Sequence, residues 1–130
     1  MPTNISSIDT YAFSDCSGLT SIPELPSSII SIGQRAFFNC VNLSGALTLP
    51  NSITSIEYET FYRCESLSSL TLPSNLLSIG EEAFYVCKNI KQLHLPNSVV
   101  GLSRRAFGFC YGLSDVTIGS SLTSVIDNTF

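Results

Sequence analysis

The chain has 130 residues, a net charge of −4 and only 12% charged residues. Its length fits a single domain, residues 1–130, and excludes two ordinary ones. An acidic chain without a basic stripe is a poor candidate for nucleic-acid binding. No apolar run approaches the roughly 20 residues that span a bilayer, so neither nucleic-acid binding nor membrane insertion is expected.

The first residues do not have the pattern of a secretory leader. Residues 1–4 (MPTN) lack both the basic start and the apolar core of a signal peptide. The sequence therefore leaves three interpretations open: a cytosolic protein, a protein exported by another route, or a piece of a longer chain.

The pattern Phe-x-x-Cys recurs along the whole chain. Its phenylalanines are spaced 23 or 24 residues apart: Phe13, Phe37, Phe61, Phe84, Phe107 and Phe130. A fixed period of this length is typical of stacked repeat architectures. The sequence therefore predicts about five repeats, each built in the same way.

Each repeat contains the same expected elements in chain order. An Ile-x-x-Ile stretch, or its equivalent, runs along one side. The spacing of three in Phe-x-x-Cys-x-x-Leu predicts a tight helical or 3₁₀ turn. A Leu-x-Leu pair then predicts a short strand with one buried face, ended by a residue such as Pro73. Stacked copies would form one parallel sheet with a rung spacing of about 4.8 Å.

These motifs resemble the BspA-like class of leucine-rich repeats. The resembling segment reads Cys64-x-x-Leu67-x-x-Leu70-x-Leu72-Pro73, then Leu76-x-x-Ile79-Gly80-x-x-Ala83-Phe84-x-x-Cys87. The resemblance implies a repeat solenoid, a leucine-rich-repeat horseshoe with a parallel β-sheet of short strands. Short turns or 3₁₀ or helical segments would form its other side. It also implies a cell-surface or secreted protein that binds like an adhesin, without catalytic residues or cofactors.

The outward positions of the predicted strands form a first candidate binding surface. These positions are mostly Ser and Thr but change character in the fourth and fifth repeats. A serine–histidine–aspartate triad can be drawn through them, but no nucleophile elbow or oxyanion hole accompanies it. We therefore predict a binding surface without chemistry, formed by Ser69, Thr71, Gln92, His94, Asp115 and Thr117.

The position after each repeat phenylalanine is aromatic in three consecutive repeats, at Phe38, Tyr62 and Tyr85. If the repeat phenylalanine points inward, this aromatic ridge points outward. Exposed aromatic side chains are favoured at protein interfaces. Neighbouring rings can instead pack laterally and stiffen the stack, and the sequence leaves both interpretations open.

The five cysteines fall in one column, with one cysteine in each repeat. Stacking places their sulfurs in a row, whereas zinc needs ligands that converge on a point. Parallel side chains also suit a disulfide poorly. We therefore expect five reduced, buried cysteines that act as small apolar residues, and no metal.

Charged residues of both signs lie two positions before four of the repeat phenylalanines. Arg35 and Glu59 become neighbours across rungs, as do Glu82 and Arg105. The expectation is a surface ladder in which each pair contributes under about 1 kcal/mol.

Two functional hypotheses follow. The chain is a non-catalytic module that binds a protein or glycan, or it is a structural spacer within a longer array. Apolar residues near Val125, Ile126 and Phe130 also predict end-to-end self-association, because an uncapped repeat exposes its edge.

Overall fold

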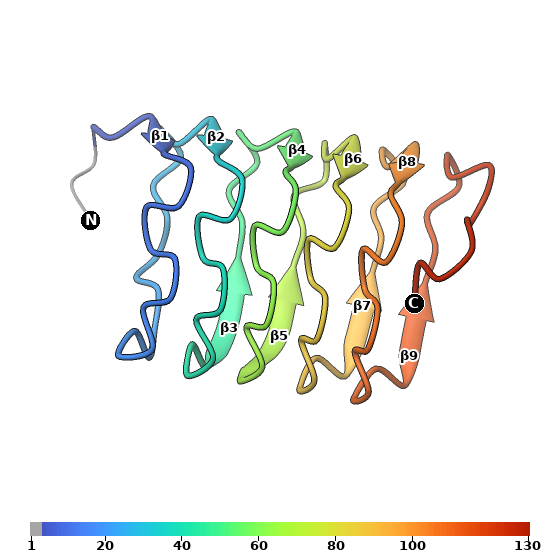
Figure 1. Ribbon diagram of the computed structural model, residues 1–130. Helices are drawn as coiled ribbons and strands as arrows, with labels where there is room; N and C mark the ends of the chain where they lie inside the picture. The colour runs from blue at the N-terminus through green and yellow to red at the C-terminus, as the bar shows by residue number, and fades with distance from the viewer. Residues whose placement is uncertain (1–3) are drawn as a thin grey trace.

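The computed structural model describes residues 4–130, which stack into a solenoid of about five turns. Figure 1 shows the turns in a row, with the two ends of the chain at opposite ends of the stack. The prediction of a repeat solenoid is confirmed. Residues 1–3, on which the expectations about a signal peptide and the domain start partly rest, lie outside the described residues.

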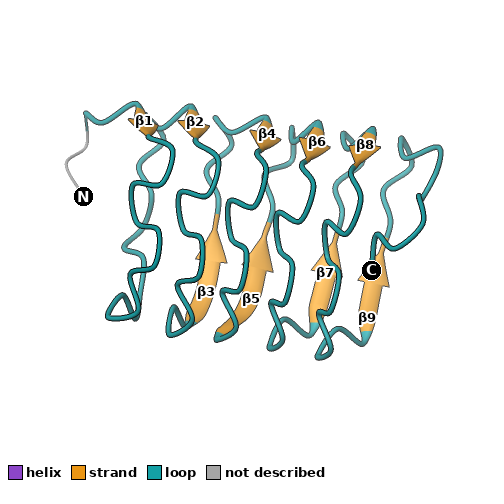
Figure 2. Cartoon of the chain, in the orientation of Figure 1, coloured by secondary structure: helices purple, strands orange, loops and turns teal. Residues whose placement is uncertain are grey.

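Two sets of short strands run along different edges of the stack (Figures 1 and 2). The longer strands carry the predicted Leu-x-Leu pattern: β3 (Gly45–Thr48), β5 (Leu67–Thr71), β7 (Gln92–His94) and β9 (Asp115–Thr117). Strands of two residues lie at the isoleucine column: β1 (Ser7–Ile8), β2 (Ser31–Ile32), β4 (Ser55–Ile56), β6 (Ser78–Ile79) and β8 (Gly101–Leu102). Every pairing is parallel. The sequence did not predict the two-residue strands at the isoleucine column.

The prediction of one continuous sheet is wrong. β3 pairs with β5, and β7 pairs with β9, but no ladder joins β5 to β7. The first repeat forms no strand beside β3, at a point where Pro23 offers no backbone N–H. Because β4, β6 and β8 form a three-stranded sheet across the same turns, the break between β5 and β7 is confined to one edge.

The prediction of a helical or 3₁₀ turn is also wrong, because residues 4–130 contain no helix (Figure 2). The backbone N–H groups of Arg35, Phe37 and Asn39 instead donate to the next turn, at N···O distances of 2.7–3.0 Å. The N–H groups between them donate three residues back within their own turn. A helix would direct all of these bonds along one segment, whereas here every second bond joins two turns.

This hydrogen-bond pattern requires an unusual backbone conformation. Arg35 and Asn39 have φ angles of 55° and 57°, in the left-handed region that residues with a side chain rarely adopt. The equivalent positions are left-handed in the other repeats: Tyr11, Asp15, Glu59, Arg63, Glu82, Val86, Arg105 and Phe109. The inter-turn hydrogen bonds offset the local cost of this conformation.

The core consists of ladders of like residues, as the period predicts. The rings of Phe13, Phe37, Phe61, Phe84 and Phe107 stack with centroids 5.2 or 5.3 Å apart and planes within 9° of parallel. Most residues of the isoleucine and leucine columns beside them are buried in the inner turns. Such a stack is stabilised mainly by contacts between neighbouring turns.

Candidate binding surface

The outward side chains of β3, β5, β7 and β9 form the strand face. The six predicted surface residues lie on it, and all are exposed: Ser69, Thr71, Gln92, His94, Asp115 and Thr117. Register places Gln92 opposite Asp115, and His94 opposite Thr117. His94 therefore pairs with a threonine rather than with Asp115, so the strand face does not assemble the acid–histidine contact of a triad.

These six side chains make no hydrogen bond or ion pair with other residues of the described chain. Hydroxyl groups elsewhere join the turns to one another. The Oγ atom of Ser52 donates to the carbonyl oxygen of Ile29 at 2.5 Å, and that of Ser98 donates to Leu76 at 2.6 Å. The strand face is thus polar, exposed and not needed by the fold's own hydrogen bonding.

A hollow of about 350 Å³ opens between β5 and β7, where the ladder is broken. It is lined by five residues with polar side chains, whose carbon atoms also contribute to the lining: Ser68, Ser69, Lys91, Gln92 and Ser114. The sequence prediction includes Ser69 and Gln92 but misses the other three. A signal exists, since Lys91 is the one charged residue in a column that otherwise reads Thr20, Ser44, Ser68 and Ser114.

The aromatic ridge is a stack of half-buried rings. Phe38 and Tyr62 lie 4.8 Å apart at 11°, and Tyr62 and Tyr85 lie 5.2 Å apart at 15°. Partial burial raises the pKa of the Tyr62 hydroxyl. Each ring covers the face of the next, so the three rings expose mainly their edges. This geometry favours lateral packing over a free anchor.

Two further rings extend the ridge and were not predicted. Phe109 contacts Tyr85 edge-on at 5.1 Å, and Tyr111 lies 5.7 Å from Phe109. Phe109 is 50% exposed and Tyr111 is 75% exposed. The signal for this shift is Gly108, which replaces an aromatic residue in the ridge column.

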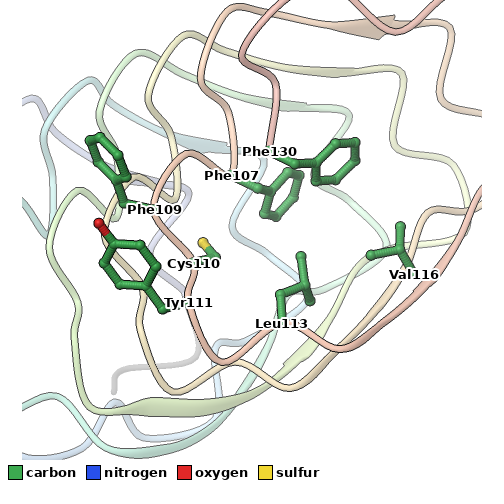
Figure 3. Close-up of a pocket in the computed structure, with 7 residues that line it drawn as sticks. All are labelled: Phe107, Phe109, Cys110, Tyr111, Leu113, Val116 and Phe130. Atoms are coloured by element: carbon green, nitrogen blue, oxygen red, sulfur yellow. The ribbon is translucent and has the colours of Figure 1, made fainter.

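An apolar hollow of about 380 Å³ lies beside these two rings. Figure 3 shows the rings of Phe107 and Phe130 side by side, with Phe109 and Tyr111 at one margin and Val116 at the other. The hollow occupies the C-terminal face of the stack. The rings of Phe107 and Phe130 are 6.0 Å apart, so the phenylalanine ladder continues to the last residue.

The Arg35–Glu59 pair is not the surface contact that the sequence predicts. Glu59 is buried and binds the guanidinium of Arg35. That guanidinium also lies over the rings of Phe38 and Tyr58, at 5.3 and 5.2 Å. The hydrogen bond to Glu59 raises the Arg35 pKa further above its ordinary value. The second predicted pair, Glu82 with Arg105, forms at 3.3 Å and is more exposed.

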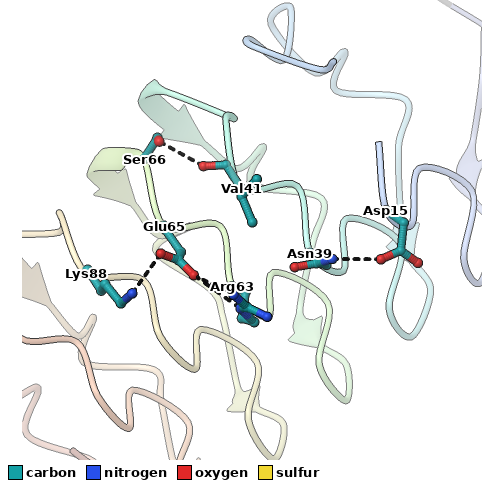
Figure 4. A network of polar contacts seen from close by, with 7 residues as sticks. All are labelled: Asp15, Asn39, Val41, Arg63, Glu65, Ser66 and Lys88. Atoms are coloured by element: carbon teal, nitrogen blue, oxygen red, sulfur yellow. Dashed lines mark hydrogen bonds and ion pairs between the residues drawn. The ribbon is translucent and has the colours of Figure 1, made fainter. Parts of the chain in front are cut away.

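A second polar network joins neighbouring turns on the surface (Figure 4). Glu65 binds Lys88 at 2.8 Å and Arg63 at 3.1 Å. The hydrogen bond from Lys88 is the main cause of the lowered pKa of the Glu65 carboxyl. In the same view, the side-chain amide of Asn39 donates to Asp15 at 2.8 Å, and the Ser66 hydroxyl donates to the carbonyl oxygen of Val41.

The cysteine column is buried except in the first repeat. Cys16 is partly exposed, so the expectation that all five cysteines are buried is wrong at that position. Each of the other thiols lies within 3.0–3.3 Å of the phenylalanine carbonyl oxygen of the preceding turn. These cysteines are therefore weak donors as well as small apolar residues. Burial raises the pKa of Cys40 to about 11 and that of Cys110 to about 12.

In the described part of the chain, no group of three or more His, Cys, Asp or Glu side chains could hold a metal ion. Within the same residues, no helix has the length and apolar character needed to cross a bilayer.

Parallel strands, stacked phenylalanines and a polar strand face define a leucine-rich-repeat solenoid. A family model described as the BspA type leucine-rich repeat region, with six copies, matches residues 6–130. The chain belongs to this BspA-type family, as the resemblance implies. No curated protein matches the chain.

Solved structures of leucine-rich-repeat proteins have the same fold. A leucine-rich-repeat protein of Bacteroides ovatus is 36% identical with a TM-score of 0.85. The match covers 91% of this chain and 30% of that protein. A leucine-rich-repeat protein of T. pallidum is 28% identical with a TM-score of 0.79, and the match covers 89% of this chain and 66% of that protein. A leucine-rich cell-surface protein of Faecalibacterium prausnitzii also shares the fold. It is 23% identical with a TM-score of 0.55, and the match covers 95% of this chain and 45% of that protein. The chain therefore spans less than two thirds of each of these proteins.

Proposed function

We propose that this chain is a non-catalytic recognition module that binds a macromolecule through its strand face. The proposal is based on the six predicted side chains of the strand face. They are exposed, and none of them forms a hydrogen bond or ion pair with the rest of the described chain. A fold that used this face only for stability would commit its polar groups to neighbouring turns, as Ser52 and Ser98 are committed elsewhere.

Variation along the strand face further supports recognition. One outward column has threonine at Thr48 and Thr71 but histidine at His94. The other has small residues at Ala46 and Ser69, then Gln92 and Asp115. A spacer needs no such variation, whereas a specific contact requires donors and acceptors at defined positions.

Aromatic anchors for a protein partner lie at the end of the ridge rather than in its middle. Phe38, Tyr62 and Tyr85 cover one another, whereas Phe109 and Tyr111 are exposed. Exposed aromatic residues contribute strongly to binding when a partner covers them. We assign the anchor role to Phe109 and Tyr111, with Tyr85 supporting Phe109.

The size of the module sets its affinity. Five turns at about 4.8 Å give a face roughly 24 Å across, which is adequate for only part of a standard interface of about 800 Å² per partner. Binding by this segment alone is therefore weak and increases in longer arrays through multivalency. BspA-type repeats are typical of microbial surface proteins, and we place the protein at the cell surface or outside the cell.

The second candidate function is a structural spacer. The continuous ring stacks and the inter-turn hydrogen bonds favour it, because they make the stack stiff regardless of any ligand. A spacer requires the strand face to bind nothing.

A binding screen against matrix proteins and glycans separates the two functions. We expect a ligand whose affinity falls when Gln92, His94 and Asp115 are changed together to alanine, or when Phe109 and Tyr111 are. The matched control is Tyr62→Phe, which keeps the ring stack. If longer arrays that contain these repeats bind nothing, the spacer function replaces recognition.

A further inference from the structure

The hollow between β5 and β7 lies where the strand face interrupts its own hydrogen bonding. Leu95 donates its backbone N–H to Thr117 of the β9 turn at 2.9 Å. Because N–H groups alternate sides along a strand, those of Gln92 and His94 point toward β5. β5 and β7 form no ladder. The hollow therefore lies beside backbone N–H groups that no strand pairs with, as well as polar side chains.

The residues that line this hollow favour a ligand that can form hydrogen bonds. Three serines, one glutamine and one lysine line about 350 Å³, without an aromatic or aliphatic side chain. The hydroxyl groups of Ser68 and Ser114 already donate to the carbonyl oxygens of Gly45 and Lys91 in neighbouring turns. An apolar group that covered the hollow would leave the side chains of Ser69, Lys91 and Gln92 without hydrogen-bond partners, which is unfavourable. A ligand that carries many hydroxyl groups matches a surface that carries both donors and acceptors.

The charge of the hollow adds a second requirement. Lys91 is its one charged lining residue, and no ion pair within residues 4–130 engages its ammonium group. Lys88, three residues earlier, is bound to Glu65 at 2.8 Å. Asp115 faces Gln92 from β9, so a negatively charged group must enter from the β5 side, beside Ser69.

We propose that the β5–β7 hollow is a subsite for a carboxylated sugar, whose carboxylate pairs with Lys91 while its hydroxyl groups bind Ser69 and Gln92. The inference rests on the proposed function and names a ligand class for the strand face. Without an aromatic ring to stack on the sugar, affinity comes from hydrogen bonds and one ion pair. A single subsite is therefore weak, and repeated arrays raise the affinity.

The test uses an oligogalacturonate and a neutral malto-oligosaccharide of equal length as probes. Titration of the 130-residue protein is followed by amide NMR shifts. We expect the acidic probe to shift the amides of Lys91, Gln92 and Ser69, and the neutral probe to bind at least tenfold more weakly. Lys91→Ala should lose at least tenfold in affinity, while the charge-matched control Lys88→Ala should retain it.

Several outcomes would overturn the inference. These are equal binding of both probes, equal loss in Lys88→Ala and Lys91→Ala, or shifts confined to another face. If no sugar binds but a protein ligand is lost on changing Gln92, His94 and Asp115 together, the sugar subsite is wrong and the recognition function stands. If neither kind of ligand binds, both fail.

Discussion

The ring of Tyr85 lies against Gly108 so closely that a Cβ atom there would be 2.9 Å from Cδ2 of the ring. The missing side chain lets Tyr85 lean over the last complete turn and meet the edge of Phe109 at 5.1 Å. Because residue 108 is glycine, the aromatic ridge continues from Tyr85 to Phe109, one position later in the repeat.

Changing Gly108 should test this packing. We expect Gly108→Ala to destabilise the protein by about 1 kcal/mol, because the Tyr85 ring must move. Gly80→Ala should cost more, because its Cβ would lie 2.8 Å from the backbone of Glu57. Gly18→Ala, with no atom within 4 Å, should change stability by less than about 0.5 kcal/mol. Denaturant unfolding measures all three, and any other order would contradict the packing argument.

Removing Arg35 should be more costly than removing Arg105. Arg35→Met leaves the buried Glu59 carboxylate without its cation, and we expect a loss of about 1–3 kcal/mol. Arg105→Met breaks a more exposed pair with Glu82 and should cost less than about 1 kcal/mol. Unfolding free energies from denaturant titration provide the measurement. Equal losses would show that burial of Glu59 has no energetic effect.

Thiol labelling should distinguish Cys16 from the other cysteines. Burial raises the pKa of the four inner thiols, so at pH 8 they are protonated as well as inaccessible. We expect one fast-reacting thiol in the native protein and five after denaturation without reductant. Cys16→Ser should abolish the fast phase. Rapid native labelling of Cys64 or Cys87 would disprove the buried column.

Stability should fall in acid partly through Glu65. The pKa of this carboxyl is lowered in the folded state by Lys88 and then by Arg63. Its contribution is therefore fully present above the unfolded-state pKa of about 4.3, and is lost as the pH falls through the folded-state value. Glu65→Gln should destabilise at pH 7 by under about 1 kcal/mol and have a smaller effect at pH 3. An effect independent of pH would show that the ion pairs contribute nothing.

The C-terminal face should promote association of the 130-residue chain. Val125, Ile126 and Phe130 are each exposed by 44–49%, although the residues equivalent to Val125 and Phe130 in the inner turns are buried. We propose end-to-end contact through this face, driven by apolar burial. Light scattering should show a mean mass that increases with concentration, and Ile126→Ser with Phe130→Ser should suppress the increase. A strict monomer over a wide concentration range would rule the contact out.

The repeat period explains why much of the fold can be predicted from the sequence. Turns in a solenoid contact only their neighbours, so a spacing of 23 or 24 residues specifies which side chains meet. The stack of Phe37 on Phe61, the contact of Arg35 with Glu59 and the exposure of His94 all follow from column position alone.

The same argument fails where the outcome depends on how each turn distributes its backbone hydrogen bonds. A spacing of three between Phe37 and Cys40 fits a helix, but the alternating bonds to the next turn produce a different conformation. The break between β5 and β7 is equally invisible to column position, because both strands carry the expected pattern. The hollow around Lys91 therefore appears only in three dimensions.

The sequence alone thus determined the family, the period and the identity of each buried and exposed column, because these depend on contacts between equivalent residues. Only the tertiary structure decided the burial of Glu59, the displacement of the ridge to Phe109, and the polar hollow beside Gln92. Each of these features depends on small shifts between adjacent turns. One missing side chain or one missing hydrogen bond changes which atoms the residues of a column contact.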